Sequence, residues 1–86
     1  MFLSVYHFAG DPATLHSAHD RLLTTFPIGP TDLHLCLASE HGISVVDACP
    51  SREVFEAFSA SPEFRSALAQ VGLPEPRVQP LGEVIR

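Results

Sequence analysis

The sequence predicts an α+β fold in which helices cover one face of a four-stranded antiparallel sheet. Two strand-like segments joined by a tight turn lie near the middle of the chain, and helical patterns precede and follow them. With one further strand-like segment at each end, the order is β-α-β-β-α-β, that of the ferredoxin-like split βαβ arrangement. A length of 86 residues suits a single domain, 1–86, with a modest core.

The first strand and helix are predicted from composition and from residues that begin and end such elements. The segment from Phe2 to Phe8 is rich in aromatic and β-branched side chains, as strands are. Asp11 is a good N-cap, and Pro12 is a good first helical residue. Apolar residues then recur at spacings of three and four, which indicates a buried stripe. The stripe holds Ala18, Leu22 and Phe26 and borders Leu15, His19 and Leu23, and the helix ends at Pro27, Gly29 and Pro30.

Residues 33–38 and 43–48 are predicted to form a hairpin. Leucine alternates with other side chains in the first segment, and the second is β-branched and apolar except for Asp47. Residues 40–42, with the sequence Glu-His-Gly, supply the turn. We expect Gly42 to adopt a positive φ there.

The length of the hairpin loop decides which side chains meet across it. A loop of two or four residues places His34 opposite Asp47 and Cys36 opposite Val45, on a shared face. A three-residue loop breaks this pairing, and the sequence leaves both possibilities open.

The first hairpin strand has two different faces. One face of residues 33–38 carries three leucines, and the other carries His34, Cys36 and Ala38. Because leucines make the better core, we expect them to pack against the helices and the other set to face outward. A sheet face with a thiol, an alanine and valines is too apolar to remain in water, which predicts a homodimer closed through it.

The second helical region is predicted in two pieces. Ser51 caps the first piece, and Ser61-Pro62 begins a new or sharply kinked helix, because proline is favoured only at the first helical position. Gly72 closes that helix. Residues 74–81 form a proline-containing edge strand, and 82–86 receive no assignment. The inward-facing residues of the first piece are Val54, Phe55 and Phe58.

Composition excludes several classes of function. Five arginines, no lysine and ten acidic residues give a net charge of −5, so no basic patch is available for nucleic acid. No apolar run approaches the roughly 18 residues needed to cross a bilayer. The first residues lack the pattern of a secretory signal, so we expect a cytoplasmic protein with no membrane partner. Two cysteines in such a protein are more often buried thiols than a disulfide.

Several motifs resemble small actinobacterial proteins of the dimeric α+β barrel superfamily, related to antibiotic-biosynthesis monooxygenases. The motifs are Gly42-Ile-Ser-Val-Val-Asp47, Ser51-Arg-Glu-Val-Phe-Glu-Ala-Phe58, Ser61-Pro-Glu-Phe-Arg65 and Gly72-Leu-Pro-Glu-Pro76. The resemblance implies a homodimeric α+β barrel with a pocket between sheet and helices in each subunit. Cys49 stands where the family usually has tryptophan, and the chain has neither Trp nor Asn, so the oxygenase residues of the family do not carry over.

His34, Asp47 and Cys36 are the candidate catalytic residues. Asp47 can fix the tautomer of His34 and raise its basicity, so that the imidazole abstracts a proton from a phenol or an activated carbon. Cys36 becomes a nucleophile if that histidine ionises it. The alternative is a hydrogen-bonded pair of His34 and Asp47 that serves only structure at the dimer interface.

Other residues are candidates for binding a ligand. Phenylalanines at helical spacing line an apolar pocket or belong to the core, and a tyrosine places its hydroxyl at the rim of such a pocket. His19 is the histidine best placed to meet a heme. The candidates are Tyr6, His19, Cys49, Phe55 and Phe58.

Histidine spacing permits metal coordination at two places. His16 and His19 lie three residues apart on the first helix, and His34 and Cys36 lie two apart on a strand. A stable zinc site requires such sets to converge, and the spacing matches no known signature. We therefore expect neither a metal nor another cofactor, and interpret His16 with Asp20 as a solvated pair one helical turn apart.

Two functions follow from these patterns. The first is a homodimeric barrel that binds an apolar or aromatic metabolite without chemistry. The second is a cofactor-independent monooxygenase, isomerase or cyclase that acts on an aromatic, polyketide-like substrate through His34 and Asp47. A heme protein is a third possibility, disfavoured by the absent Trp and Asn. Whether His34 lines a ligand-sized cavity or is sealed between subunits separates the first two.

Overall fold

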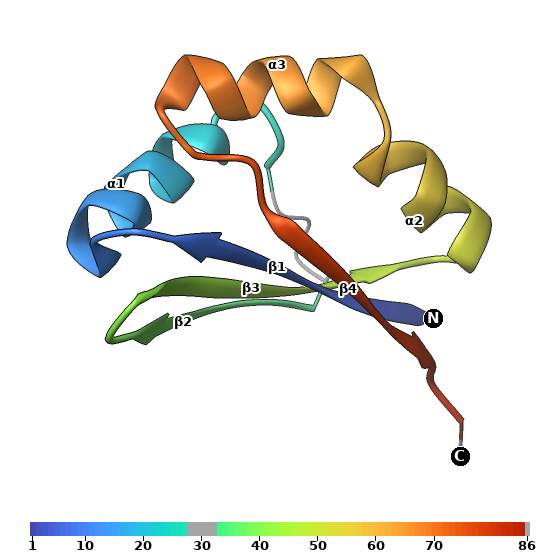
Figure 1. Cartoon of the computed structure of the whole chain (residues 1–86). Coiled ribbons are helices and arrows are strands. Elements are labelled where there is room, and N and C mark those ends of the chain that lie inside the picture. The colour runs from blue at the N-terminus through green and yellow to red at the C-terminus, as the bar shows by residue number, and fades with distance from the viewer. Residues whose placement is uncertain (28–32, 86) are drawn as a thin grey trace.

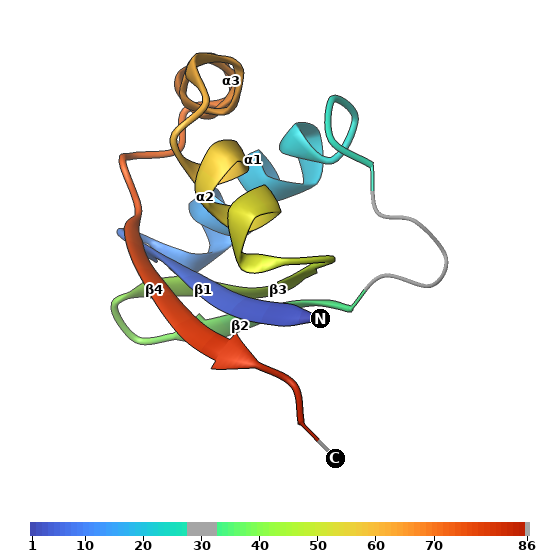
Figure 2. The same ribbon diagram turned by 90° about the vertical axis from the view of Figure 1, so that its right-hand side faces the viewer.

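The computed structural model describes residues 1–27 and 33–85 and has an α+β fold. Its strands form one four-stranded antiparallel sheet in the order β2-β3-β1-β4. Figures 1 and 2 show the helices over one face of this sheet and no element of the described chain over the other. The elements are β1 (Phe2–Ala9), α1 (Pro12–Leu22), β2 (His34–Ser39), β3 (Gly42–Cys49), α2 (Arg52–Ser59), α3 (Pro62–Val71) and β4 (Arg77–Glu83).

Each helix begins at the residue that the sequence predicts. The side chains of Asp11, Ser51 and Ser61 accept hydrogen bonds from backbone N–H groups at 3.0, 3.2 and 3.2 Å, respectively. Such a cap contributes about 1 kcal/mol and satisfies an N–H group that has no partner within the helix. Ser61-Pro62 thus begins a separate helix, and Gly72 ends it in the left-handed conformation at φ 87°.

The first helix is shorter than its apolar pattern predicts. It ends at Leu22, and the next turn continues with a backbone hydrogen bond from Phe26 N–H to the Leu22 carbonyl. Phe26 nevertheless packs against the core. Gly29 and Pro30, predicted to end this helix, lie outside the described residues.

The hairpin has the register that a two-residue loop gives. His34 pairs with Asp47 and Cys36 with Val45, which is one of the two arrangements that the sequence leaves open. The prediction of a positive φ at Gly42 is wrong, because Gly42 is not among the described residues with that conformation. A side chain at Gly42 would instead clash with the backbone carbonyl of Phe8 on β1, so close strand approach explains the glycine.

The faces of β2 are the reverse of those predicted. Leu35 and Leu37 are 49% and 54% exposed on the uncovered face, and His34 turns toward the helices. The reason is the register: β2 shares its faces with β3, whose Ile43 and Val45 are core residues. Val54 is also exposed, against the prediction that it faces inward.

Aromatic side chains connect the sheet to the helices in the core. Phe2 and Tyr6 of β1 contact the ring of Phe55 on α2, and Tyr6 also contacts Phe64 on α3 in an edge-to-face arrangement. Phe58 lies against Phe64 with ring centroids 4.5 Å apart. Such rings bury large areas and hold the helices to the sheet without help from the leucines of β2.

The last strand lies at the edge of the sheet, as its prolines require. It pairs with β1 alone, and the pairing register shifts beside Pro80. None of the helices in the described chain is long and apolar enough to pass through a lipid bilayer.

Candidate functional site

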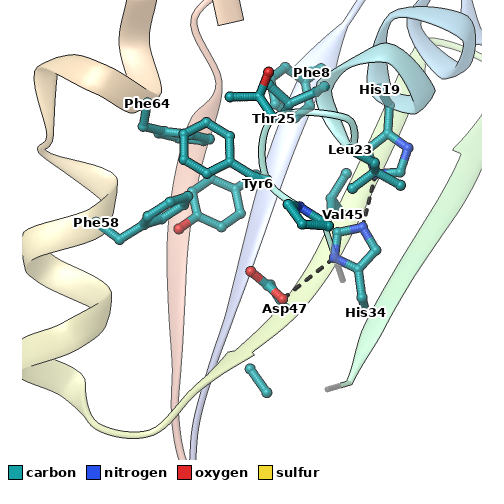
Figure 3. Close-up of a pocket in the computed structure, with 14 residues that line it drawn as sticks. Tyr6, Phe8, His19, Leu23, Thr25, His34, Val45, Asp47, Phe58 and Phe64 are labelled. Atoms are coloured by element: carbon teal, nitrogen blue, oxygen red, sulfur yellow. Dashed lines mark hydrogen bonds and ion pairs between the residues drawn. The ribbon is translucent and has the colours of Figure 1, made fainter. Parts of the chain in front are cut away.

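A pocket of about 340 Å³ lies between the sheet and the helices (Figure 3). Its walls are mainly apolar. They come from the strands of the sheet, from the C-terminal part of α1 with the turn that follows it, and from α2 and α3. The lining residues are Tyr6, Phe8, His19, Leu22, Leu23, Thr25, Phe26, Pro27, His34, Val45, Asp47, Ala48, Phe58 and Phe64.

Polar side chains form one end of the pocket. Nδ1 of His34 lies 3.5 Å from Oδ1 of Asp47, and its Nε2 lies 2.9 Å from Nε2 of His19. The two imidazoles stack with centroids 5.1 Å apart. Figure 3 shows His34 between its two partners, each from a different element. The register of β2 and β3 sets the first contact, and the packing of α1 over β2 sets the second.

His19 is held neutral by its surroundings. Burial lowers the pKa of His19, and the neighbouring imidazole of His34 lowers it further, while Asp20 acts in the opposite direction. Two imidazolium ions at 2.9 Å would repel strongly, so the hydrogen bond between the rings requires at least one neutral ring.

Tyr6 brings a hydroxyl to the same pocket. The side chain is buried, and its hydroxyl has no well-formed hydrogen bond to the described residues. Burial raises the pKa of Tyr6, and negative charge on Cys49 and Asp47 raises it further, while the contact with the Ser4 hydroxyl acts in the opposite direction, so the hydroxyl stays a neutral donor. In Figure 3 it points to the side of the pocket where Phe58 and Asp47 lie. This burial differs from the rim position expected for the hydroxyl.

Three predicted site residues lie outside the pocket lining. Phe55 packs in the core against Phe2, and Cys49 is partly buried against the same core. Cys36 is also partly buried, and burial raises the pKa of its thiol, which favours the neutral thiol over a nucleophilic thiolate. The structure therefore brings together His34, Asp47, His19, Tyr6 and Phe58.

Sequence reasoning missed the contact between His19 and His34. The two residues lie on α1 and β2, and their contact depends on β2 turning this face inward. The core pattern of Ile43 and Val45 on β3 is a signal that could have found it, because paired residues share a face. Phe26, assigned only to the helix stripe, also lines the pocket.

No protein-family model, curated protein or solved structure matches the chain. An apolar cavity with a few convergent polar groups is the usual form of a small-molecule site. At the polar end, Tyr6 can donate a hydrogen bond and the Asp47 carboxylate can accept one.

Proposed function

We propose that this protein binds a small apolar or aromatic molecule that carries one hydroxyl group, such as a phenol or an enol. The observation that carries the proposal is the pocket of about 340 Å³ with polar side chains at one end. Its size lies within the range of about 300–1,000 Å³ that is usual for such sites. The rings of Phe26, Phe58 and Phe64 meet one another along its apolar side and suit a flat ligand.

The polar end fits a hydroxyl that both donates and accepts. The Tyr6 hydroxyl is buried, and its contact with Ser4 is not a well-formed hydrogen bond, so a ligand oxygen that accepts its hydrogen reduces the free-energy cost of burying it. Asp47 lies on the same side and accepts the ligand's own proton in a charge-assisted hydrogen bond. A phenol satisfies both groups at once.

The proposal includes a ferredoxin-like subunit that forms a homodimeric barrel through the uncovered sheet face. The strand order, with β3 between β1 and β2, supports this arrangement. The exposed leucines of β2 support burial of that face against a second copy, because a monomer rarely leaves such a patch in water.

An enzyme is the second candidate, supported by the position of His34 and Asp47 in the pocket lining. General-base catalysis requires a ring nitrogen that faces the substrate. Both nitrogens of His34 are engaged, one by Asp47 and one by His19. This arrangement favours binding over proton abstraction by His34, and it makes Asp47 the group that meets a ligand's hydroxyl.

The test is binding of 1-naphthol and of its methyl ether, 1-methoxynaphthalene, by wild type and by Tyr6→Phe, measured by calorimetry and thermal shift. We expect 1-naphthol to bind wild type more tightly. Tyr6→Phe should weaken 1-naphthol roughly two- to tenfold, the value of one hydrogen bond, and should change the ether less. If the protein is an enzyme, mass spectrometry of the recovered ligand should show conversion.

Two results would contradict the proposal. One is the absence of saturable binding by any of a panel of phenols to folded wild type. The other is binding that shifts the NMR signals of the uncovered sheet face and leaves the pocket residues unchanged.

A further inference from the structure

A second cluster of polar side chains lies on α1 beside the pocket and shares His19 with the pocket lining. Nε2 of His16 lies 3.7 Å from Oδ1 of Asp20, and Nδ1 of His19 lies 3.6 Å from the same oxygen. All three atoms lie within 4.8 Å of one another. Spacings of three and four residues place these side chains on one side of the helix.

This cluster continues into the polar end of the pocket. Asp20, His19, His34 and Asp47 form a row with three contacts: carboxylate to imidazole, imidazole to imidazole, and imidazole to carboxylate. When both imidazoles are neutral, the pair carries two N–H protons. The central hydrogen bond uses one of them, so in this form of the pair a ring nitrogen without a proton faces a carboxylate at one end of the row.

The bare nitrogen belongs at the Asp20 end. The Asp47 side chain is 28% exposed, whereas Asp20 is 60% exposed and its charge is screened by water. With the His34 proton on Nδ1 toward Asp47, Nε2 of His34 accepts from Nε2–H of His19. Nδ1 of His19 then carries a lone pair and no proton. This atom is buried and makes no well-formed hydrogen bond with the described residues, although Oδ1 of Asp20 lies 3.6 Å away.

We propose that His16, His19 and Asp20 bind a divalent transition metal of the zinc class, in place of the solvated His16–Asp20 pair without metal that the sequence alone indicates. Two imidazole nitrogens and a carboxylate oxygen form a common zinc ligand set. Bond lengths of about 2.0–2.1 Å place tetrahedral ligands about 3.3 Å apart, close to the distances of 3.6 and 3.7 Å found here. A metal cation between these atoms accepts the lone pair of His19 Nδ1 and neutralises the negative charge of the Asp20 carboxylate.

The surroundings have the second shell that histidine ligands usually have. His19 donates its other ring proton to His34, whose ring is in turn oriented by Asp47. Metal on Nδ1 of His19 therefore keeps His34 as an acceptor and fixes its remaining proton toward the pocket carboxylate. Three protein ligands leave a fourth metal position for water or a further ligand, and two of the three ligand side chains are mostly exposed. This site does not depend on the proposed ligand of the pocket.

The test is titration of the untagged full-length chain with Co²⁺ and with Zn²⁺, followed by absorption spectroscopy and calorimetry. We expect one-to-one saturable binding and a four-coordinate cobalt spectrum without a thiolate charge-transfer band, which excludes the two cysteines. His16→Ala and Asp20→Asn should each weaken metal binding at least about tenfold. Mutation of a residue that only orients a metal ligand already costs about that much affinity, and loss of a ligand should cost no less. Both side chains are mostly exposed, so both variants should stay folded, which circular dichroism checks.

His41→Ala is the matched control, because His41 is an exposed histidine beside an acidic residue in the hairpin turn. It should bind metal as wild type does. The proposal is overturned if folded wild type shows no saturable binding, if His16→Ala and Asp20→Asn bind as wild type, or if His41→Ala loses as much affinity as they do. In the first case a proton alone serves as the cation between His19 and Asp20.

Discussion

The two faces of the sheet differ in polarity, and the difference runs against ordinary hydrophobic patterning: polar groups lie beneath the helices, and leucines lie on the uncovered face. The layer between helices and sheet buries His19 and the Tyr6 hydroxyl and partly buries His34 and Asp47, whereas the uncovered face of β2 exposes leucines. Burial of polar groups without full hydrogen bonding costs stability, and so does exposure of leucines to water. A chain that accepts both costs is best explained if the buried groups serve a site and a partner covers the leucines.

The register explains why this contrast is built into the fold. Side chains opposite each other in an antiparallel pair lie on the same face, so β1, β3 and β2 share one alternation. Tyr6, Val45 and Cys36 therefore lie in one row beneath the helices. Val5, Val46 and Leu35 form the next row on the uncovered face. A one-residue slip of β2 would exchange its faces and remove His34 from the pocket.

The largest expected effect comes from a charge on the covered face. Val45→Asp places a carboxylate among core side chains, at a cost of several kcal/mol, comparable to the whole stability of a small domain. We expect the variant to be largely unfolded by circular dichroism and in urea. A Val45→Asp protein that melts like wild type would show that this side of β3 is not the core face.

The next effect concerns the uncovered face. Leu37→Asp should dissociate the proposed homodimer in sedimentation, with a melting temperature that no longer depends on protein concentration. Val54→Asp is the matched control, since Val54 is 46% exposed and Leu37 54%, but Val54 lies on the helical layer. It should leave the dimer intact. A wild type that sediments as a monomer at micromolar concentration would remove the dimer from the proposal.

Local signals predicted the elements well and limited the hairpin to two arrangements. Ser51 and Ser61 are short-range caps whose effect depends only on the next few residues, and the break at Pro62 is equally local. The pairing of His34 with Asp47 was one of two possibilities, and the two-residue loop of the structure decides between them. The caps and the break at Pro62 depend only on nearby residues, where sequence spacing corresponds closely to distance in space.

The faces of β2 could not be predicted from its own composition. Three leucines outweigh a histidine, a cysteine and an alanine on any hydrophobicity scale, yet β3 and the aromatic residues of β1 decide which side is covered. The row from Asp20 to Asp47 was missed for the same reason. It requires α1 to lie over β2, and that placement comes from long-range packing of the helix stripe on the sheet.

The smallest expected effect sharpens the same contrast at a single buried atom. Tyr6→Phe removes a hydroxyl that has no well-formed partner in the described structure, so the free energy of unfolding at neutral pH should stay within about 1 kcal/mol of wild type or rise.

The two proteins should differ in stability at alkaline pH. Because burial raises the pKa of folded Tyr6 above its ordinary value of 10.0, the unfolded chain loses this proton first. The free energy of unfolding of wild type therefore keeps its full value below pH 10 and falls as the pH rises from there toward the pKa of folded Tyr6. Urea unfolding at a series of alkaline pH values should therefore show a steeper fall in stability for wild type than for Tyr6→Phe. Parallel curves for the two proteins would mean that Tyr6 ionises as easily in the folded protein as in the unfolded chain, and the buried donor at the polar end of the pocket would then be absent.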